Sequence, residues 1–220
     1  MTRLYKYGHS CLLLEERSES LLFDPGQPDF LDPKATPENF ASVSLIVVTH
    51  WHPDHADPDL IRRIVDRSGA KVLANADAVR ELQSAGVKAE LAVDGTRSYG
   101  AFKLQILRSP HAPILGSIPP ENAAYLVNDR LLNTGDSFDP RLAEFKGVPV
   151  LALPVTAPWT TELDSAGFAD RIAPRRVVPV HDGYLREFFR KRRYQTFGQH
   201  FEKKKVRFEA DVGPETAIEL

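Results

Sequence analysis

The stretch VVTHWHPDHAD at residues 47–57 places three of the chain's seven histidines and two aspartates directly behind an apolar run. That run, SLIVVT at 44–49, is apolar through its middle and rich in β-branched residues. A strand of this kind is typical of a sheet that is covered on both faces. The stretch therefore predicts a buried strand whose end presents several side chains that can bind metal.

Similar short runs recur along the chain, with helical patterns between them. Strands are expected over 2–8, 10–16, 20–24, 44–49, 71–75, 88–93, 102–108, 123–127, 130–134, 149–155 and 176–180. The first three form a meander. Asn128 and Asp129 tolerate the positive φ of a tight turn, so they predict a hairpin between the strands on either side.

Helices are expected after Asp57, which is a good N-cap, over 76–85 and over 161–173. A further helix is expected near the C-terminus. Tyr184, Leu185, Phe188 and Phe189 fall at i, i+1, i+4 and i+5, which predicts its core-facing side. The basic residues that follow, over 190–205, would then form its solvated side.

Composition fits one globular domain over residues 1–220, with a formal net charge of −2, 42% hydrophobic and 26% charged residues. No repeat or flexible linker divides the chain. Cys11 is its one cysteine, so no internal disulfide can form, and the first residues lack the apolar segment of a signal peptide. No run approaches the roughly 18 apolar residues of a membrane-spanning helix. These features predict a cytoplasmic protein that does not enter membranes.

Five of the apolar runs end in a side chain that can bind metal. These side chains are Asp24, His50, His111, Asp136 and His181. Ligand sites in α/β sheets tend to form at strand ends, so one convergent site is expected. Within 50–55, side chains at alternate positions of an extended segment share a side, which groups His50, His52 and Asp54 and turns His55 away. One segment can thus serve two adjacent metals, and a His/Asp set without cysteine suits Zn²⁺, Mn²⁺ or Fe²⁺.

The motif THWHPDH at 49–55 resembles the HxHxDH signature of the metallo-β-lactamase superfamily, and TGD at 134–136 and VPVHDG at 178–183 resemble its later motifs. The resemblance implies an α/β fold, an αββα sandwich of two mixed sheets flanked by helices, over a single hydrolase domain. YGHSCLLLE at 7–15 and the short chain are most similar to the branch that includes the ascorbate-6-phosphate lactonase.

The resemblance also implies the ligand set. The first metal would take His50, His52 and His111, the second Asp54, His55 and His181, and Asp136 would bridge them. Two divalent metals, Zn²⁺ first with Mn²⁺ or Fe²⁺ as alternatives, would hold a hydroxide that attacks a small ester, lactone or phosphoester. Asp54 and Asp136 would be the catalytic carboxylates, and Asp24 would support the motif loop from behind.

Other functions remain open. A nuclease of the same superfamily would use the basic tract at 190–205 to grip RNA or DNA, whereas the favoured reading has a small-molecule substrate. A flavodiiron redox protein resembles the motif but carries an acidic residue where His52 stands, and a binding protein would have lost ligands. Roles for His9, Trp51 and Trp159 in substrate contact, and for the segment after His111 as a lid, are left undecided.

Overall fold

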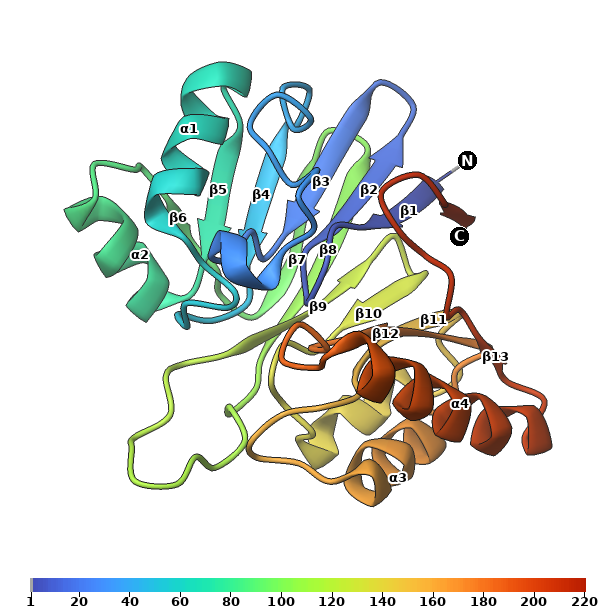
Figure 1. Ribbon diagram of the computed structural model, residues 1–220. Coiled ribbons are helices and arrows are strands. Elements are labelled where there is room, and N and C mark those ends of the chain that lie inside the picture. The colour runs from blue at the N-terminus through green and yellow to red at the C-terminus, as the bar shows by residue number, and fades with distance from the viewer. Residues whose placement is uncertain (1) are drawn as a thin grey trace.

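The computed structural model describes residues 2–220, which form two seven-stranded sheets packed face to face (Figure 1). The first sheet has the order β14-β1-β2-β3-β4-β5-β6, and the second has the order β13-β12-β11-β10-β9-β8-β7. The first contains β1 (Thr2–Lys6), β2 (Leu12–Glu16), β3 (Glu19–Phe23), β4 (Leu45–Val48), β5 (Lys71–Ala74), β6 (Glu90–Leu91) and β14 (Ile218–Glu219). The second contains β7 (Gly95–Tyr99), β8 (Phe102–Arg108), β9 (Ala123–Val127), β10 (Leu131–Asn133), β11 (Val150–Pro154), β12 (Arg176–Val180) and β13 (Arg207–Phe208).

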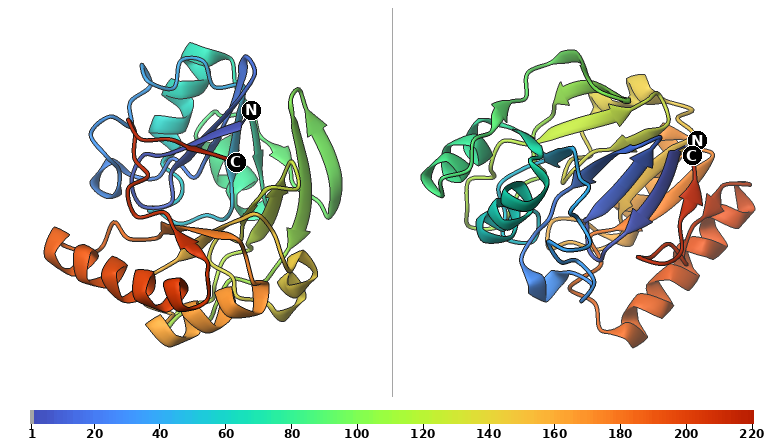
Figure 2. Two further views of the ribbon diagram at one scale, coloured as in Figure 1. Left: turned by 90° about the vertical axis from the view of Figure 1, so that its right-hand side faces the viewer. Right: turned by 90° about the horizontal axis from the view of Figure 1, so that it is seen from above.

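Helices cover the outer faces of both sheets, as the three ribbon views agree (Figures 1 and 2). The first sheet carries α1 (Pro58–Ser68) and α2 (Ala76–Ser84), and the second carries α3 (Glu162–Ile172), α4 (Glu187–Lys203) and the 3-10 helix η2 (Pro140–Phe145). A short 3-10 turn, η1 (Pro28–Phe30), lies in the loop after β3. The expected αββα sandwich is confirmed. Within residues 2–220, no helix has the length and apolar content needed to cross a membrane.

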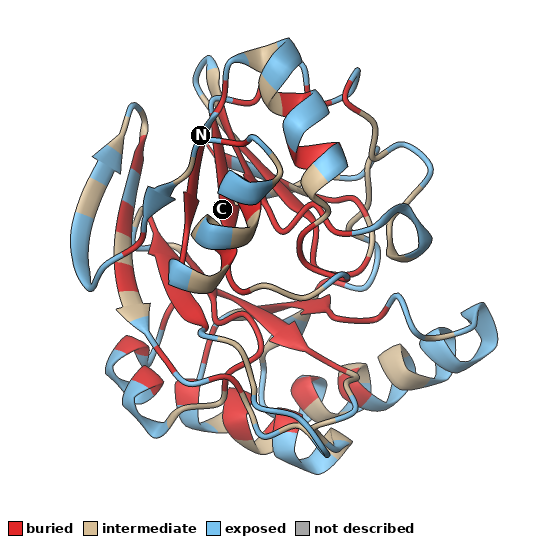
Figure 3. Ribbon diagram, turned by 90° about the vertical axis from the view of Figure 1, so that its left-hand side faces the viewer, coloured by how far each residue is buried: buried red, intermediate tan, exposed pale blue. Residues whose placement is uncertain are grey.

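The apolar run of β4 is buried on both of its faces, as expected. Leu45 and Val47 point into the core between the two sheets, while Ile46 and Val48 point into the second core beneath α1 and α2. Figure 3 shows the result across the molecule, with buried strands inside and exposed helix surfaces outside. The strand is therefore held from two sides, and so is the loop that follows it.

Both sheets are mixed, since antiparallel hairpins join parallel crossover units. The meander β1-β2-β3 is antiparallel, and β3-β4-β5 are parallel. The predicted hairpin is confirmed, because β9 and β10 pair antiparallel and Asn128 and Asp129 have φ of 50° and 55°. In the second sheet, β10, β11 and β12 are parallel, and the loops after β10 and β12 carry residues of the candidate site.

Two sequence-based expectations were wrong. The strand expected over 88–93 is reduced to the two exposed residues of β6, and the edge strand β7 went unpredicted because GTRSY has no apolar alternation. The predicted core face of α4 is also wrong, since Phe188 and Phe189 are 69% and 57% exposed. The buried residues of α4 are Phe197 and Phe201, because the helix packs on β13 through its second half.

The close packing of the segment after β3 against the motif loop generates a stability prediction. Gly26 lies where a Cβ would collide with the backbone carbonyl of Asp54, while Gly198 of α4 has open space around it. We expect Gly26→Ala to destabilise the chain by roughly 1–3 kcal/mol through overpacking. Gly198→Ala should instead stabilise it by about 0.5–1 kcal/mol, because alanine favours a helix. Urea unfolding of the metal-free chains measures both, and a Gly26→Ala variant as stable as the parent would contradict this packing.

Candidate metal centre

Five strand ends supply the side chains of one buried site between the sheets. Asp24 directly follows β3, His50 follows β4, His111 follows β8, Asp136 follows β10 and His181 directly follows β12. All five are at most 6% exposed. The convergence predicted from the strand ends is therefore present in the fold, built from segments far apart in the chain.

The site contains two adjacent groups of side chains, each with donor atoms within 4.8 Å of one another. One group is His50, His52, His111 and Asp136, and the other is His9, Asp54, His55 and His181. Asp136 lies between them, with one carboxylate oxygen 3.5 Å from His111 Nε2 and 3.0 Å from His181 Nε2. Its other oxygen is 3.5 Å from His55 Nε2. The seven residues named from the sequence are thus brought together, in the two sets that the resemblance implies, and His9 joins them.

The alternation argument for the motif was wrong about Asp54. The chain turns at 53–55, where the backbone N–H groups of His55 and Ala56 both donate to the carbonyl of His52, at 2.9 and 2.8 Å. Alternation applies only to extended backbone, so the turn breaks it. Asp54 consequently lies with His55 in the second group, away from His50 and His52.

Four histidine rings are fixed by hydrogen bonds from Nδ1. The acceptors are Thr49 Oγ1 for His50 at 3.0 Å, Asp24 Oδ2 for His55 at 2.9 Å, Ala112 O for His111 at 2.6 Å and Thr156 O for His181 at 2.7 Å. Carbonyls and carboxylates only accept, and the Thr49 hydroxyl already donates to Asp24 at 2.8 Å. Each Nδ1 therefore carries a proton, and each Nε2 faces the centre of the site.

The inward-facing atoms fit a bound metal. The Nε2 atoms of His50, His55 and His111 and the Oδ1 atom of Asp136 are buried without a hydrogen-bond partner among the described residues. An unpaired buried polar atom costs about 1–3 kcal/mol, so native proteins rarely keep several of them together. Nitrogen and oxygen donors without thiolates suit Zn²⁺, Mn²⁺ or Fe²⁺ at a catalytic site. The donor chemistry thus matches divalent cations.

The two groups differ in their proton affinity. Burial, together with the neighbouring His55, lowers the pKa of His50 well below its usual value, and burial also lowers the pKa of His52. Burial would lower the pKa of His55 too, but the carboxylates of Asp136 and Asp24 outweigh it and raise this pKa to about 9. His50 and His52 are therefore neutral at pH 7, whereas His55 must lose a proton before it can bind a metal.

Asp24 supports the motif from behind, as the sequence suggested. It is fully buried and accepts hydrogen bonds from the backbone N–H and the hydroxyl of Thr49, both at 2.8 Å, and from His55 Nδ1. It therefore orients two histidine rings at once: His55 directly, and His50 through the Thr49 hydroxyl. Carboxylates in this position fix the ring and raise its strength as a ligand.

Two aromatic residues also donate to the carboxylates of the site. Trp159 Nε1 donates to Asp136 Oδ2 at 2.8 Å, and the Tyr184 hydroxyl donates to Asp54 Oδ2 at 2.9 Å. Sequence reasoning left Trp159 open and assigned Tyr184 to a helix core, which the structure contradicts. The available signal was position, since Tyr184 follows His181 by three residues. Trp51, in contrast, packs on the apolar cluster beneath α1 and α2.

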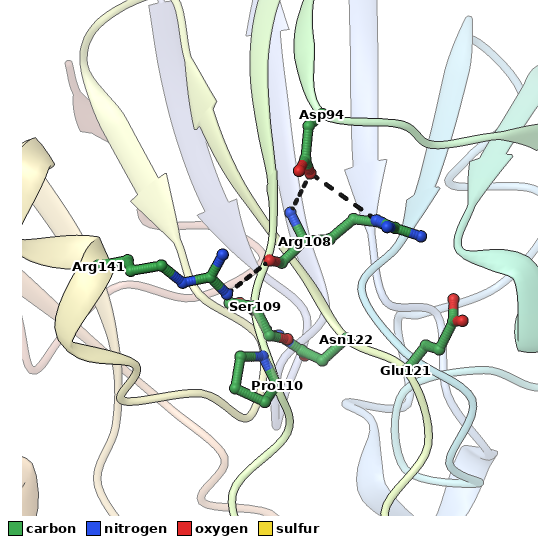
Figure 4. Close-up of a pocket in the computed structure, with 7 residues that line it drawn as sticks. All are labelled: Asp94, Arg108, Ser109, Pro110, Glu121, Asn122 and Arg141. Carbon is green, nitrogen blue, oxygen red and sulfur yellow. Dashed lines mark hydrogen bonds and ion pairs between the residues drawn. The ribbon is translucent and has the colours of Figure 1, made fainter.

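A pocket of about 210 Å³ opens onto both groups. It is lined by His52, Pro53, Asp54, Ile114, Ser117, Asp136, Pro158, Trp159, His181 and Tyr184. A second hollow of about 350 Å³ is lined in part by Arg108, which reaches Asp94, and by Asn122 (Figure 4). Asn122 connects the two regions, because its side chain accepts from the backbone N–H of Asp136 at 3.1 Å. The smaller pocket is the one that adjoins the His/Asp groups.

Comparison with known proteins identifies the family. The sequence model of the beta-lactamase superfamily domain matches residues 3–181. The chain is 32% identical to Protein Rv0786c of Mycobacterium tuberculosis, over 83% of this chain and 85% of that protein. It is also 31% identical to a metal-dependent hydrolase of Pyrococcus horikoshii, over 82% and 84%. The chain therefore belongs to the metallo-β-lactamase superfamily, as its motifs implied.

Solved structures agree with the fold. The metallo hydrolase Igni18 of Ignicoccus hospitalis superposes with a TM-score of 0.74 at 20% identity, over 100% of this chain and 99% of that one. An isothiocyanate hydrolase from Delia radicum gut bacteria gives 0.71 at 13% identity, over 99% of both chains. At such identities the likeness concerns the fold alone.

Removing the charge of Asp24 should weaken metal binding without touching a donor atom. In Asp24→Asn the amide has one accepting oxygen in place of two, so it cannot accept from both Thr49 and His55 as the carboxylate does. The His55 ring therefore loses the hydrogen bond that orients it. We expect metal affinity to fall about 10–100-fold. Asp59→Asn, on the exposed surface of α1, is the matched control and should bind as the parent does. Equilibrium dialysis with Zn²⁺ measures this, and equal affinities for all three chains would refute the supporting role.

The two groups should respond differently to pH. Below about 9, His55 is increasingly protonated, and protons compete with metal at the second group. Affinity there should fall about tenfold per pH unit on acidification, one proton being displaced. The first group should hold its metal, because the pKa values of His50 and His52 are lowered. Zn²⁺ content after dialysis at pH 8 and pH 6 tests this, and a parallel loss from both groups would contradict it.

Proposed function

We propose that this chain hydrolyses a small uncharged ester or lactone by means of two divalent metals held at the His/Asp centre. It is an enzyme of the metal-dependent hydrolase class within its superfamily, the class after which its Pyrococcus horikoshii relative is named. Its substrate, the number of its metals and their identity belong to the proposal.

One observation carries the proposal: buried Nε2 lone pairs and an unpaired Asp136 oxygen face one another across two adjacent groups. His50, His52, His111 and Asp136 would hold one metal. Asp54, His55, His181 and the same Asp136 would hold the other. Two divalent metals in such a site acidify water and so supply a nucleophile at neutral pH. Zn²⁺ is the first choice, with Mn²⁺ or Fe²⁺ as alternatives.

Side chains of the pocket supply the remaining parts of a hydrolysis reaction. Asp54 faces the pocket and is the carboxylate placed to accept a proton from the attacking water. Burial and the nearby Asp54 raise the pKa of the Tyr184 hydroxyl, so it stays protonated. Its single O–H donates to Asp54, and would donate to a substrate oxygen only by turning away from that carboxylate. Trp159 holds Asp136 in place through its indole N–H.

The lining of the pocket favours an uncharged substrate. No lysine or arginine is among the described residues that line it, while Ile114, Trp159 and prolines supply apolar surface. A phosphoester would keep a negative charge, and beyond the two metals no described lysine or arginine lines the pocket to pair it. Ile114 and Ser117 come from the loop after β8, whose neighbours Leu115 and Ile118 are fully exposed. This loop forms the outer wall and is the segment able to close over a substrate.

A nuclease activity is less well supported. The basic tract at 190–205 does not line the pocket, and several of its charges are paired, as Lys191 is with Glu187 and Lys204 with Asp170. The finer resemblance to the lactonase branch stays a prediction, and the absence of a cation among the lining residues does not favour a phosphorylated lactone. We therefore place a small neutral molecule first among substrates.

The test compares substrates and two neighbouring aspartates. The Zn²⁺- or Mn²⁺-loaded chain should hydrolyse p-nitrophenyl acetate and simple lactones faster than bis-p-nitrophenyl phosphate. Asp136→Asn should lower kcat/KM roughly 10²–10⁴-fold, since it removes a ligand common to both metals. Asp139→Asn is the control, because Asp139 caps η2 and pairs with Arg141 but does not line the pocket, and asparagine caps equally well. Preference for the phosphodiester, or full activity in Asp136→Asn, would refute the proposal.

A further inference from the structure

His9 is the eighth polar residue of the metal centre, and nothing in the motif accounts for it. It lies in the loop between β1 and β2, is 1% exposed, and has a φ of 40°. One of its ring nitrogens lies within 4.8 Å of donor atoms of Asp54, His55 and His181. By distance alone, His9 qualifies as a fourth ligand of the second group.

The directions of its hydrogen bonds exclude that role. The backbone N–H of Gly183 donates to His9 Nδ1 at 2.9 Å, so Nδ1 uses its lone pair there and carries no proton. A neutral imidazole has one N–H, which must then be on Nε2. Nε2 lies 3.1 Å from Asp54 Oδ2 and donates to it. The four histidines fixed through Nδ1 show the opposite arrangement, with the proton on Nδ1 and the lone pair on Nε2.

We propose that His9 is a positioning residue: it donates from Nε2 to Asp54 and binds the loop that carries His181, so that it aligns the second metal group without being a ligand. This inference rests on the proposed dinuclear site. The backbone of His9 takes part as well, since its carbonyl accepts from the His181 N–H at 3.2 Å. One residue from the N-terminal loop thus holds ligands from the β4 loop and the β12 loop together.

Two features of the chain fit this role. Gly183 lies so close that a Cβ there would be 2.9 Å from His9 Nδ1 and 3.0 Å from the Phe30 carbonyl, so a side chain at 183 would push the ring away. Backbone strain gathers at the same place, since Asp24, His9 and His181 have φ of 45°, 40° and 61°. Positive φ at such residues persists where the surrounding structure imposes it, commonly at functional sites.

Zn²⁺ binding by three full-length chains tests the proposal. His9→Gln keeps an N–H near the position of Nε2, whereas His9→Phe keeps the ring shape and removes both nitrogens. In His9→Phe, the first Zn²⁺ should bind as in the parent and the second about 10–100-fold more weakly. His9→Gln should recover most of this loss. Competition with a chromophoric chelator measures both steps without relying on turnover, and Gly183→Ala should reproduce the His9→Phe pattern.

The proton can also be located directly in the unaltered chain. Long-range ¹H–¹⁵N correlation spectra of the Zn²⁺-loaded parent should show one buried histidine with its proton on Nε2, and this signal should vanish in His9→Phe.

The outcomes separate the competing roles. An unchanged second Zn²⁺ affinity in His9→Phe would overturn the positioning role. Equal losses in His9→Gln and His9→Phe, with the His9 proton on Nδ1, would make His9 a ligand and overturn it as well. A parent chain that binds no second Zn²⁺ would instead refute the dinuclear function, whatever the variants do.

Discussion

The hydrogen bonds from Nδ1 of four buried histidines are the constraint on which the site depends. Each one turns Nε2 toward the centre, and in His50, His55 and His111 this atom has no hydrogen-bond partner among the described residues. The acceptors are mostly backbone carbonyls and the buried Asp24, which are fixed by the fold and cannot rotate away. The chain itself thus sets the positions of the ligand atoms. The favourable packing around the unpaired nitrogens offsets the free energy that their burial costs.

That packing comes from strands which are apolar on both faces. β4, β11 and β12 each send alternate side chains into the core between the sheets and into an outer core beneath the helices. Because such a strand is packed on both faces, its end is fixed in space. The short loop that follows the strand is therefore fixed as well. The strained φ values of Asp24, His9 and His181 are sustainable for the same reason, since the neighbouring strands over-determine them.

The sequence predicted those features of the fold and the site that depend on neighbouring residues in the chain. Continuous apolar runs predicted the buried strands, Asn128 and Asp129 predicted the hairpin, and the strand ends together with the HxHxDH resemblance named seven residues that do meet. It failed where tertiary packing decides. Because the chain turns at 53–55, Asp54 lies in the second group and not with His50 and His52. Phe188 and Phe189 have the spacing of a helix face that packs on a core, but they are exposed. The role of Gly183 gave no signal, because it depends on His9, which lies 174 residues earlier in the chain.

The dependence of late residues on early ones extends beyond His9. Lys6 of β1 and Asp182 form a buried ion pair of 2.8 Å, and Tyr194 of α4 contacts both side chains. Removing one partner of such a pair leaves an uncompensated buried charge, so the pair specifies one arrangement of the loop that carries His181. The N-terminal strand is therefore part of the active-site structure, although it supplies none of the seven proposed ligands. The family match covers both this strand and His181, since it spans residues 3–181.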